Sequence, residues 1–266
     1  NQAWIRIHIT IGCNTEASWE PDGQYMNICE DWGTFPDVIA HEYTHAVAGS
    51  MIGFQRDEQG KIIVRGLAVH EALGDIFAVF ASADDDETIW QINGLPPERT
   101  VVSDLRNPLP NWPRNYNERY WDREIFIQRE IGILKRKICL EEIDGYPDCG
   151  HINSIILSHA AYLMSEGGDQ GGDIPREKLQ YLFYGTMESG LLQPSSNLKQ
   201  AANAILTTCK RIVGKSDFIQ NKVVNDVFSD EDCRQVQQSL YTVGLISLPP
   251  IPLPQVELPT LPAMPN

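Results

Sequence analysis

The sequence predicts an α+β protein in which a short run of strands is followed by a series of helices. Residues 1–30 alternate apolar and polar side chains with the period of a strand, whereas later segments repeat apolar residues with the period of a helix. Most of these later segments are bounded by capping residues or glycines. A chain of 266 residues is long enough for one large domain or for two lobes around a cleft.

The strands are expected at the start of the chain. In the stretch WIRIHITI, residues 4–11, isoleucines fall on one face of an extended chain and polar residues on the other. The first helix is expected to follow at TFPD, where Thr34 is a candidate N-cap, Pro36 suits the first turn and Asp37 closes a capping box. This helix should end near Gly49.

The rest of the chain is expected to be mainly helical. A second helix begins near Gly66 and is apolar nearly all round, so it should be buried. Residues 94–122, rich in Pro, Asn and Arg, are expected to form a long loop. Ser229 with Asp232 predicts a capping box for the last helix. Further helices are expected at 122–143, 151–166, 174–189, 195–213 and 230–243.

The C-terminal segment, residues 246–266, is rich in proline and is expected to be extended and polyproline-like. Its apolar side chains predict that residues 249–262 pack along the N-terminal strands. The formal net charge of -15 disfavours nucleic acid and anionic membranes as partners. No apolar run approaches the roughly 18 residues that cross a bilayer.

The six cysteines favour an oxidising compartment, because an even number of them falls into couples that would each close a short loop. Disulfides of this kind are typical of secreted or extracellular proteins, and free thiols in a cytosolic protein are the alternative. No signal-peptide pattern is present and the chain starts at Asn1, so a processed product or a trimmed segment is expected. The couples are Cys13 with Cys29, Cys139 with Cys149, and Cys209 with Cys233.

The strongest chemical signal is HEYTH, within the stretch VIAHEYTHAVAG. Positions i and i+4 lie on one face of a helix, so His41 and His45 can direct both imidazoles at one ion. Glu42 projects beside them, where a carboxylate can contact a water on that ion. Two neutral nitrogen ligands and an adjacent base are what a zinc hydrolase needs. The alternative is a pair of hydrogen-bonded core histidines.

A third ligand is expected in the second helix, because a catalytic zinc takes three protein ligands and keeps a fourth position open. Glu71 lies in an otherwise apolar helix, where a bare carboxylate would be costly and a metal removes that cost. Asp75, one turn later, can accept a hydrogen bond from the far nitrogen of a histidine ligand. Two partly exposed helix acids are the alternative, and their apolar neighbours argue against it.

Three ordered motifs resemble those of the thermolysin-like zinc metalloproteases, of the gluzincin class. HEYTH is similar to the family's zinc helix HExxH, and GLAVHEALGD to its Gly-x-x-Asn-Glu-x-x-x-Asp helix. HINSIILSHAAYLMSEGG is similar to its His-x-Asn-Ser segment, which opens a helix ending in Gly-Gly. Together with PREKLQYLFYGTM and SLYTVGL, the resemblance covers most of residues 1–245.

The resemblance implies a two-lobed thermolysin-like fold with the zinc helix in the cleft. Residues 1–66 would be the remnant of a truncated β-rich N-terminal lobe with the zinc helix. Residues 67–245 would be a mainly α-helical C-terminal lobe with an insertion near 122–149, and residues 246–266 a tail. The first part of the N-terminal lobe is absent or belongs to a cleaved propeptide or lobe.

The resemblance also implies roles for the polar residues of the two motif helices. His41, His45 and Glu71 would bind zinc. Glu42 would activate the attacking water as the general base. Asp75 would hold the far nitrogen of His41.

Further roles follow from the later motifs. His151 would steady the oxyanion of the tetrahedral intermediate, oriented by Asp148 or, alternatively, by Asp144. Arg99 would contact a substrate carbonyl, with Arg106 as the alternative.

Substrate would bind along the segment NTEASW, which resembles the edge strand of the family. Ala17 and Trp19 match that strand, and Val38 would line the pocket for an apolar residue after the scissile bond. The family's asparagine in this strand is replaced by Glu16, or is shifted to Asn14.

Other positions depart from the family pattern. Phe54 stands where the family has a tyrosine that contacts the oxyanion, and losing such a donor can cost about 10²–10³ in rate. His70 replaces an asparagine, so it either bonds His45 or alters the metal geometry. A calcium site is weakly supported, because Asp37 is in place but residues 84–87 are more typical of a solvated acidic turn.

Two functions fit this sequence. The first is a secreted zinc-dependent endopeptidase that acts on protein or peptide substrates, with Glu42 as the base. The second is an inactive or binding relative that keeps a structural zinc, a reading favoured by the truncated lobe, Phe54 and Glu16. A purely structural site would not need Glu42, which favours the enzyme.

Overall fold

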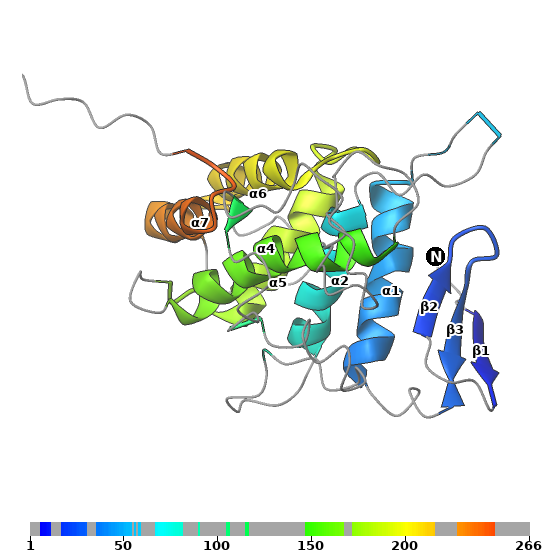
Figure 1. Cartoon of the computed structure of the whole chain (residues 1–266). Helices are drawn as coiled ribbons and strands as arrows, with labels where there is room; N and C mark the ends of the chain where they lie inside the picture. Colours follow the sequence, from blue (N-terminus) through cyan, green and yellow to red (C-terminus); the bar gives the residue numbers. More distant parts are fainter. Residues whose placement is uncertain are drawn as a thin grey trace, which may run out of the picture.

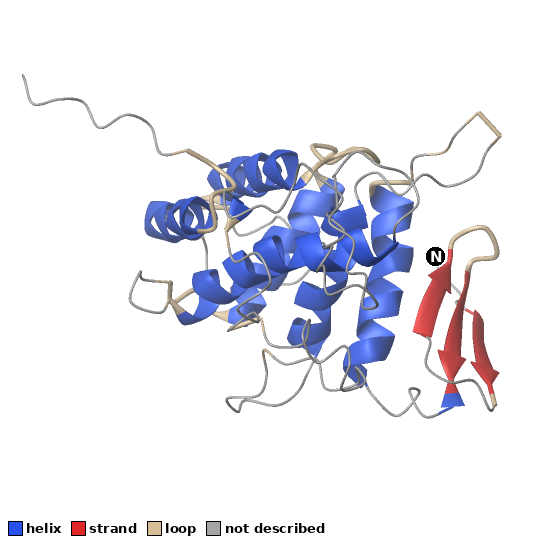
Figure 2. Cartoon of the chain, viewed as in Figure 1, coloured by secondary structure: helices blue, strands red, loops and turns tan. Residues whose placement is uncertain are grey.

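In the computed structural model, a small sheet is followed by a group of packed helices, and Figures 1 and 2 show the strands at one side of the molecule. Within the helix at 147–166, the side chains of 147–149 and 151–152 are not described. The helix expected at 122–143 and the proline-rich tail lie outside the described residues. The structure describes residues 6–11, 17–30, 36–54, 56, 58–59, 67–81, 90, 105–106, 115–116, 147–167, 172–215 and 228–247.

The expected strands form a three-stranded sheet in the order β1-β3-β2. β1 (Arg6–Thr10) runs parallel to β3 (Tyr25–Cys29), and β2 (Ala17–Glu20) runs antiparallel to it. The central strand is half covered, because Met26, Ile28 and Cys29 are buried while Tyr25 and Asn27 are only partly buried. Every residue of β1 is exposed, so the isoleucine face predicted there is not covered by any described residue.

Helix α1 (Pro36–Met51) connects the sheet to the other helices, since it packs on β2 at one side and on α2 at the other (Figure 1). Val38 joins Met26 and Ile28 in a small apolar cluster between α1 and the sheet. The helix ends where Gly53 adopts a φ of 83°, a conformation that favours glycine. Its predicted N-cap, at residue 34, lies outside the described residues.

Helix α2 (Leu67–Ala81) is buried along most of its length, as its apolar sequence predicts. It packs against α1 and against α4 (Pro147–Glu166). α4 begins four residues before the predicted start at residue 151. The central position of α2 brings its polar residues into the interior, where they need partners.

The C-terminal helices are α5 (Arg176–Glu188), α6 (Leu198–Ile212) and α7 (Asp230–Thr242). The capping box predicted at Ser229 and Asp232 is confirmed. α6 starts later than predicted, because Asn197 forms a capping box of its own with Gln200.

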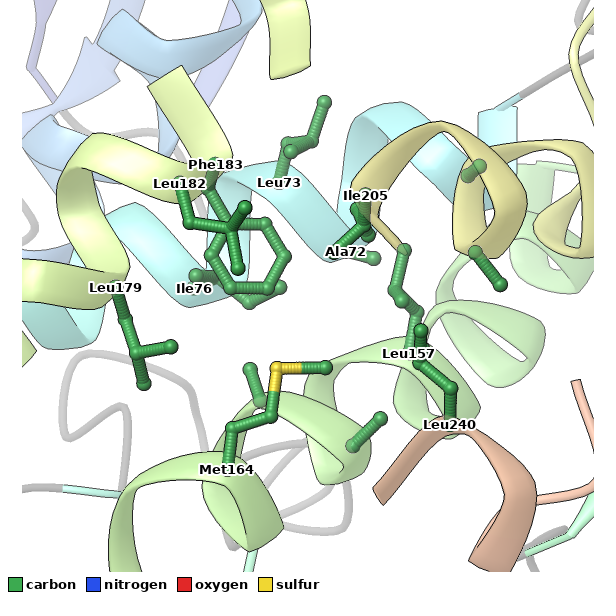
Figure 3. Packing of buried hydrophobic residues seen from close by; sticks show 14 of the residues in the cluster. Ala72, Leu73, Ile76, Leu157, Met164, Leu179, Leu182, Phe183, Ile205 and Leu240 are labelled. Atoms are coloured by element: carbon green, nitrogen blue, oxygen red, sulfur yellow. The ribbon is translucent and has the colours of Figure 1, made fainter. Parts of the chain in front are cut away.

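These helices share one apolar core, shown in part in Figure 3. The predicted disulfide between Cys209 and Cys233 is confirmed, and it ties α6 to α7. Cys29 is also disulfide-bonded, and its predicted partner, Cys13, lies outside the described residues. The residues labelled in Figure 3 are Ala72, Leu73, Ile76, Leu157, Met164, Leu179, Leu182, Phe183, Ile205 and Leu240.

Candidate metal centre

Three side chains from two adjacent helices converge between α1 and α2. His41 and His45 lie one turn apart on α1, and Glu71 comes from the buried part of α2. One ligand atom from each lies within 4.8 Å of the other two. The helical spacing therefore produces the cluster that the sequence predicts.

Ring nitrogens and carboxylate oxygens face one another in this cluster, and each can present a lone pair when it carries no proton. The Nε2 atoms of His41 and His45 are 3.1 Å apart, and Glu71 Oε2 is 3.2 Å from His41 Nε2. Glu71 Oε1 is 3.6 Å from His45 Nε2. Acceptor atoms at these distances repel one another unless a proton or a cation lies between them.

These separations fit a zinc ion. With bonds of about 2.0–2.1 Å in a tetrahedron, neighbouring zinc ligands lie roughly 3.3 Å apart. The separations of 3.1, 3.2 and 3.6 Å lie close to that value, with the last two measured to different oxygens of the Glu71 carboxylate. Two imidazole nitrogens and one carboxylate are also the donor set of many catalytic zinc sites. The residues present therefore fit the ion that the motif predicts.

Helix α2 also contacts the ring nitrogen of His41 that faces away from the cluster. Its Nδ1 atom lies 3.2 Å from Oδ1 of Asp75, which is 2% exposed. Gly74 makes this approach possible, because a Cβ atom there would lie 2.7 Å from His41 Cε1. The contact fixes Nδ1 as the protonated nitrogen of a neutral ring, so that Nε2 can act as a ligand.

Burial and hydrogen bonding have opposite effects on the pKa of His41. Burial by itself lowers this pKa, but hydrogen bonds to Asp75 and Glu71 outweigh it, so the pKa lies well above its usual value. The raised pKa favours protonation of this ring. Because a metal ligand must be a neutral imidazole, a metal ion competes with a proton at this ring.

Glu42 is buried beside the cluster, on the turn of α1 that separates the two histidines. Its charge contributes to the raised pKa of His41, so the two side chains interact electrostatically. Glu42 does not belong to the three-residue ligand group. A carboxylate next to the ligands, and not among them, can act as a base.

His70 does not hydrogen-bond His45, one of the two expectations for this position. Neither of its ring nitrogens has a hydrogen-bond partner among the described residues, and its ring centroid is 6.5 Å from that of His45. It stacks on Phe54 instead, at 4.8 Å between centroids. Burial lowers the pKa of His70, against the effects of Glu71 and the Gly53 backbone, and favours a neutral ring.

Comparison with known proteins extends this picture. Residues 66–230 match the family described as thermolysin metallopeptidase, alpha-helical domain. The chain belongs to the thermolysin metallopeptidase family. The match begins just before α2 and ends at the start of α7, so it includes Glu71 but not α1, which carries His41 and His45.

Among curated relatives of this family, the chain is 28% identical over 196 residues to a bacillolysin of Bacillus caldolyticus. It is 27% identical over 196 residues to a thermolysin of Alicyclobacillus acidocaldarius, and 26% identical over 209 residues to neutral protease B of Bacillus subtilis. These matches cover 70%, 70% and 76% of this chain but only 31%, 31% and 32% of the relatives. The chain therefore spans about a third of their length.

Some of the positions predicted to bind substrate lie on described elements. Ala17 and Trp19 lie on β2, an edge strand that packs on α1, and their contact with a peptide stays a prediction. Val38 is buried against the sheet, and its role in a specificity pocket stays a prediction. Residues 148 and 151 lie in the first turns of α4, but their side chains are outside the description.

The other predicted positions contribute less to the site. Arg106 is half-buried, and Asp37 lies in the first turn of α1, where a carboxylate also suits the helix dipole. The remaining predicted positions, including most of the calcium candidates, lie outside the described residues. They are Asn14, Glu16, Asp84, Asp85, Asp86, Glu87, Arg99 and Asp144.

Two polar neighbours of the site are not among the residues predicted from the sequence. Ser154 and Ser158, on α4, both direct their hydroxyls at Asp75. Their spacing of four residues in an apolar helix places them on one face, which is a signal that the sequence does contain.

Proposed function

We propose that this protein is a zinc-dependent endopeptidase that hydrolyses peptide bonds in protein or peptide substrates. The observation that carries the proposal is the convergence of His41, His45 and Glu71, with Glu42 buried beside them, in a chain of the thermolysin metallopeptidase family. A site with only a structural role would have no use for an additional buried carboxylate next to the ligands.

His41, His45 and Glu71 would hold the ion through two nitrogens and one carboxylate. When bound, zinc supplies a Lewis acid that polarises the peptide carbonyl and acidifies a water molecule. Asp75 keeps His41 oriented through its Nδ1 atom. Because α1 and α2 pack directly on each other, the three ligands are held by the rigid part of the fold.

Glu42 carries the proton chemistry in this proposal. Its carboxylate accepts a proton from the attacking water and delivers it to the nitrogen of the leaving amine. Its burial keeps the group next to the reacting atoms and away from competing solvent. An amide at this position would keep the shape of the side chain but could not accept the proton.

The substrate would lie along β2. This strand is at an edge of the sheet, so its outer backbone groups can pair with an extended peptide. Ala17 and Trp19 would contact that peptide, and an apolar residue after the scissile bond would be preferred. His151, oriented by Asp148, would steady the developing oxyanion, and Arg99 would bind a substrate carbonyl.

An extracellular location belongs to the same proposal. The Cys209–Cys233 disulfide and the disulfide-bonded Cys29 support it, because such bonds persist in oxidising compartments. None of the described helices is long and apolar enough to cross a bilayer.

Hydrolysis of labelled, unfolded casein tests the proposal. The zinc-loaded protein should cleave casein, a chelator should stop the cleavage, and added zinc should restore it. Glu42→Gln should retain zinc and lose turnover, while Glu188→Gln, at an exposed position of α5, should leave the rate unchanged. If the wild-type protein binds zinc but cleaves nothing, the inactive or binding relative is the better description.

A further inference from the structure

Asp75 is contacted from two helices at once. Its Oδ1 atom faces Nδ1 of His41 at 3.2 Å. Its Oδ2 atom accepts from Ser154 Oγ at 3.4 Å and from Ser158 Oγ at 3.3 Å. Both serines are 0% exposed and Asp75 is 2% exposed, so these contacts are shielded from water.

A buried carboxylate needs donors to compensate for its lost hydration. The two serine hydroxyls supply them on the oxygen that His41 does not use, so the two ends of the carboxylate are held by different helices. With both oxygens engaged, rotation of the Asp75 side chain would break at least one of these contacts. The orientation of His41 then depends on α4 as well as on α2.

Ser158 has a second possible acceptor. Its Oγ lies 3.2 Å from the backbone carbonyl of Ser154, one turn earlier in α4. One hydroxyl proton cannot serve both acceptors fully. Hydrogen bonds to ionised acceptors are roughly twice as strong as bonds between neutral groups, which favours the Asp75 carboxylate.

We propose that Ser154 and Ser158 are positioning residues, whose hydroxyls hold the Asp75 carboxylate in the orientation that fixes the ring of His41 for a metal ion. The inference rests on the proposed function in so far as His41 is a metal ligand. Neither serine contacts the metal or the substrate in this account, and each acts only through Asp75. The pair also links the metal centre to α4, the helix on which residue 151 lies.

The test measures the zinc dissociation constant of the full chain by competition with a chromogenic chelator. Replacing the partners of a metal ligand typically weakens metal binding about 10–100-fold, and the double variant Ser154→Ala/Ser158→Ala should fall near the lower end, roughly tenfold. Each single variant should lose less zinc affinity than the double variant. Ser239→Ala, which removes a buried hydroxyl from α7, is the matched control and should bind zinc like the wild-type protein.

A double-mutant cycle separates this role from general support of the fold. In an Asp75→Ala background the two serine substitutions should cause no further loss of zinc affinity, because the residue through which they act is gone. If Asp75→Ala does not fold, Asp75→Leu replaces it, since it removes both acceptor oxygens and fills a similar volume. Circular dichroism of each metal-free variant verifies the fold.

The outcomes distinguish the two proposals. A wild-type protein that binds no zinc would overturn both. Normal zinc binding that the serine substitutions leave unchanged would overturn only the role of the serines. If the serine substitutions weakened zinc binding equally with and without Asp75, the proposed role of the serines would also be overturned. The serines would then act through the fold and not through the carboxylate.

Discussion

The helical body and the sheet of this molecule are held together in different ways. The helices share one continuous apolar core, to which α1, α2 and α4–α7 all contribute. The sheet has only a small apolar cluster, formed by β3 with Val38 of α1 and flanked by Ala17 and Trp19 of β2. Its outer strand β1 has no covered residue, and Ile7, Ile9 and Ile11 are 50%, 65% and 79% exposed.

Because of this difference, we expect the helical body and the sheet to have separate roles. The proposed metal ligands lie on α1 and α2, whose packing is part of the large core. The predicted peptide-binding strand lies on the sheet, which touches the body through α1. Stability should therefore depend mainly on the helical body, whereas changes in the sheet should affect substrate binding before they affect the metal.

The largest effect is expected in the centre of the helical core. Phe183 lies in the core shown in Figure 3 and is 0% exposed. Its ring centroid is 6.1 Å from that of Phe80. Phe183→Ala should lower the free energy of unfolding by about 3–5 kcal/mol, because it removes apolar contacts and leaves a cavity. Urea denaturation of the metal-free protein measures the loss. A change below about 1 kcal/mol would mean that this core is not as closely packed as described.

The disulfide between α6 and α7 should give the next largest effect. It closes a separation of 24 residues, for which chain entropy predicts about 3.5 kcal/mol. The double variant Cys209→Ala/Cys233→Ala should therefore have a lower melting temperature. Wild-type protein treated with a reductant should approach the melting temperature of the variant, and a stable reduced protein would contradict the prediction.

Asp232 should give a smaller effect that depends on pH. Burial by itself raises the pKa of this carboxyl, but hydrogen bonds from Lys178 and Ser229 outweigh it and hold the pKa below its usual value of about 3.8. Asp232→Asn should cost about 1.5–3 kcal/mol at neutral pH, the range for hydrogen bonds to charged groups. Lys178 is itself buried, so it would lose its charged partner.

The sign of the pH dependence follows from the lowered pKa. Stability from Asp232 is fully present above pH 3.8 and is lost as the pH falls through the lower pKa of the folded state. The difference in unfolding free energy between wild type and Asp232→Asn should thus shrink below pH 3.8. A difference that stays constant down to pH 2 would exclude this ionic contribution.

The smallest effect is expected on the exposed strand. Ile9→Thr keeps a β-branched side chain at a position that is 65% exposed. The free energy of unfolding should change by less than about 0.5 kcal/mol, as for most surface substitutions. Solubility should rise, because an exposed apolar edge strand promotes association. A large loss of stability would mean that β1 is covered in the folded protein.

Local signals predicted most of the secondary structure correctly. Ser229 with Asp232 specifies the start of α7 through bonds within a few residues, and the apolar sequence of α2 specifies its burial. Helix α6 begins after residue 195, the predicted start, because Asn197 and Gln200 form a capping box there. Boundaries depend on competition between neighbouring caps, which periodicity does not resolve.

The candidate metal site was also predictable from local sequence patterns. His41 and His45 share a helix face by spacing alone, and Glu71 and Asp75 stand out in an apolar helix. The contacts of Asp75 with Ser154 and Ser158 span 79 and 83 residues, so they depend on how α4 packs on α2. The stacking of His70 on Phe54 also required the three-dimensional structure, because it depends on how α2 packs against α1.

Zinc analysis of wild-type and Glu71→Ala protein tests the central claim most directly, because Glu71 joins α2 to the two histidines of α1. Both proteins are dialysed against the same zinc buffer, and bound metal is measured by atomic absorption, with circular dichroism to verify the fold. The account predicts about one zinc per wild-type chain and little or none in Glu71→Ala, as expected when a three-residue ligand set loses one member. Undiminished zinc in folded Glu71→Ala protein would contradict it.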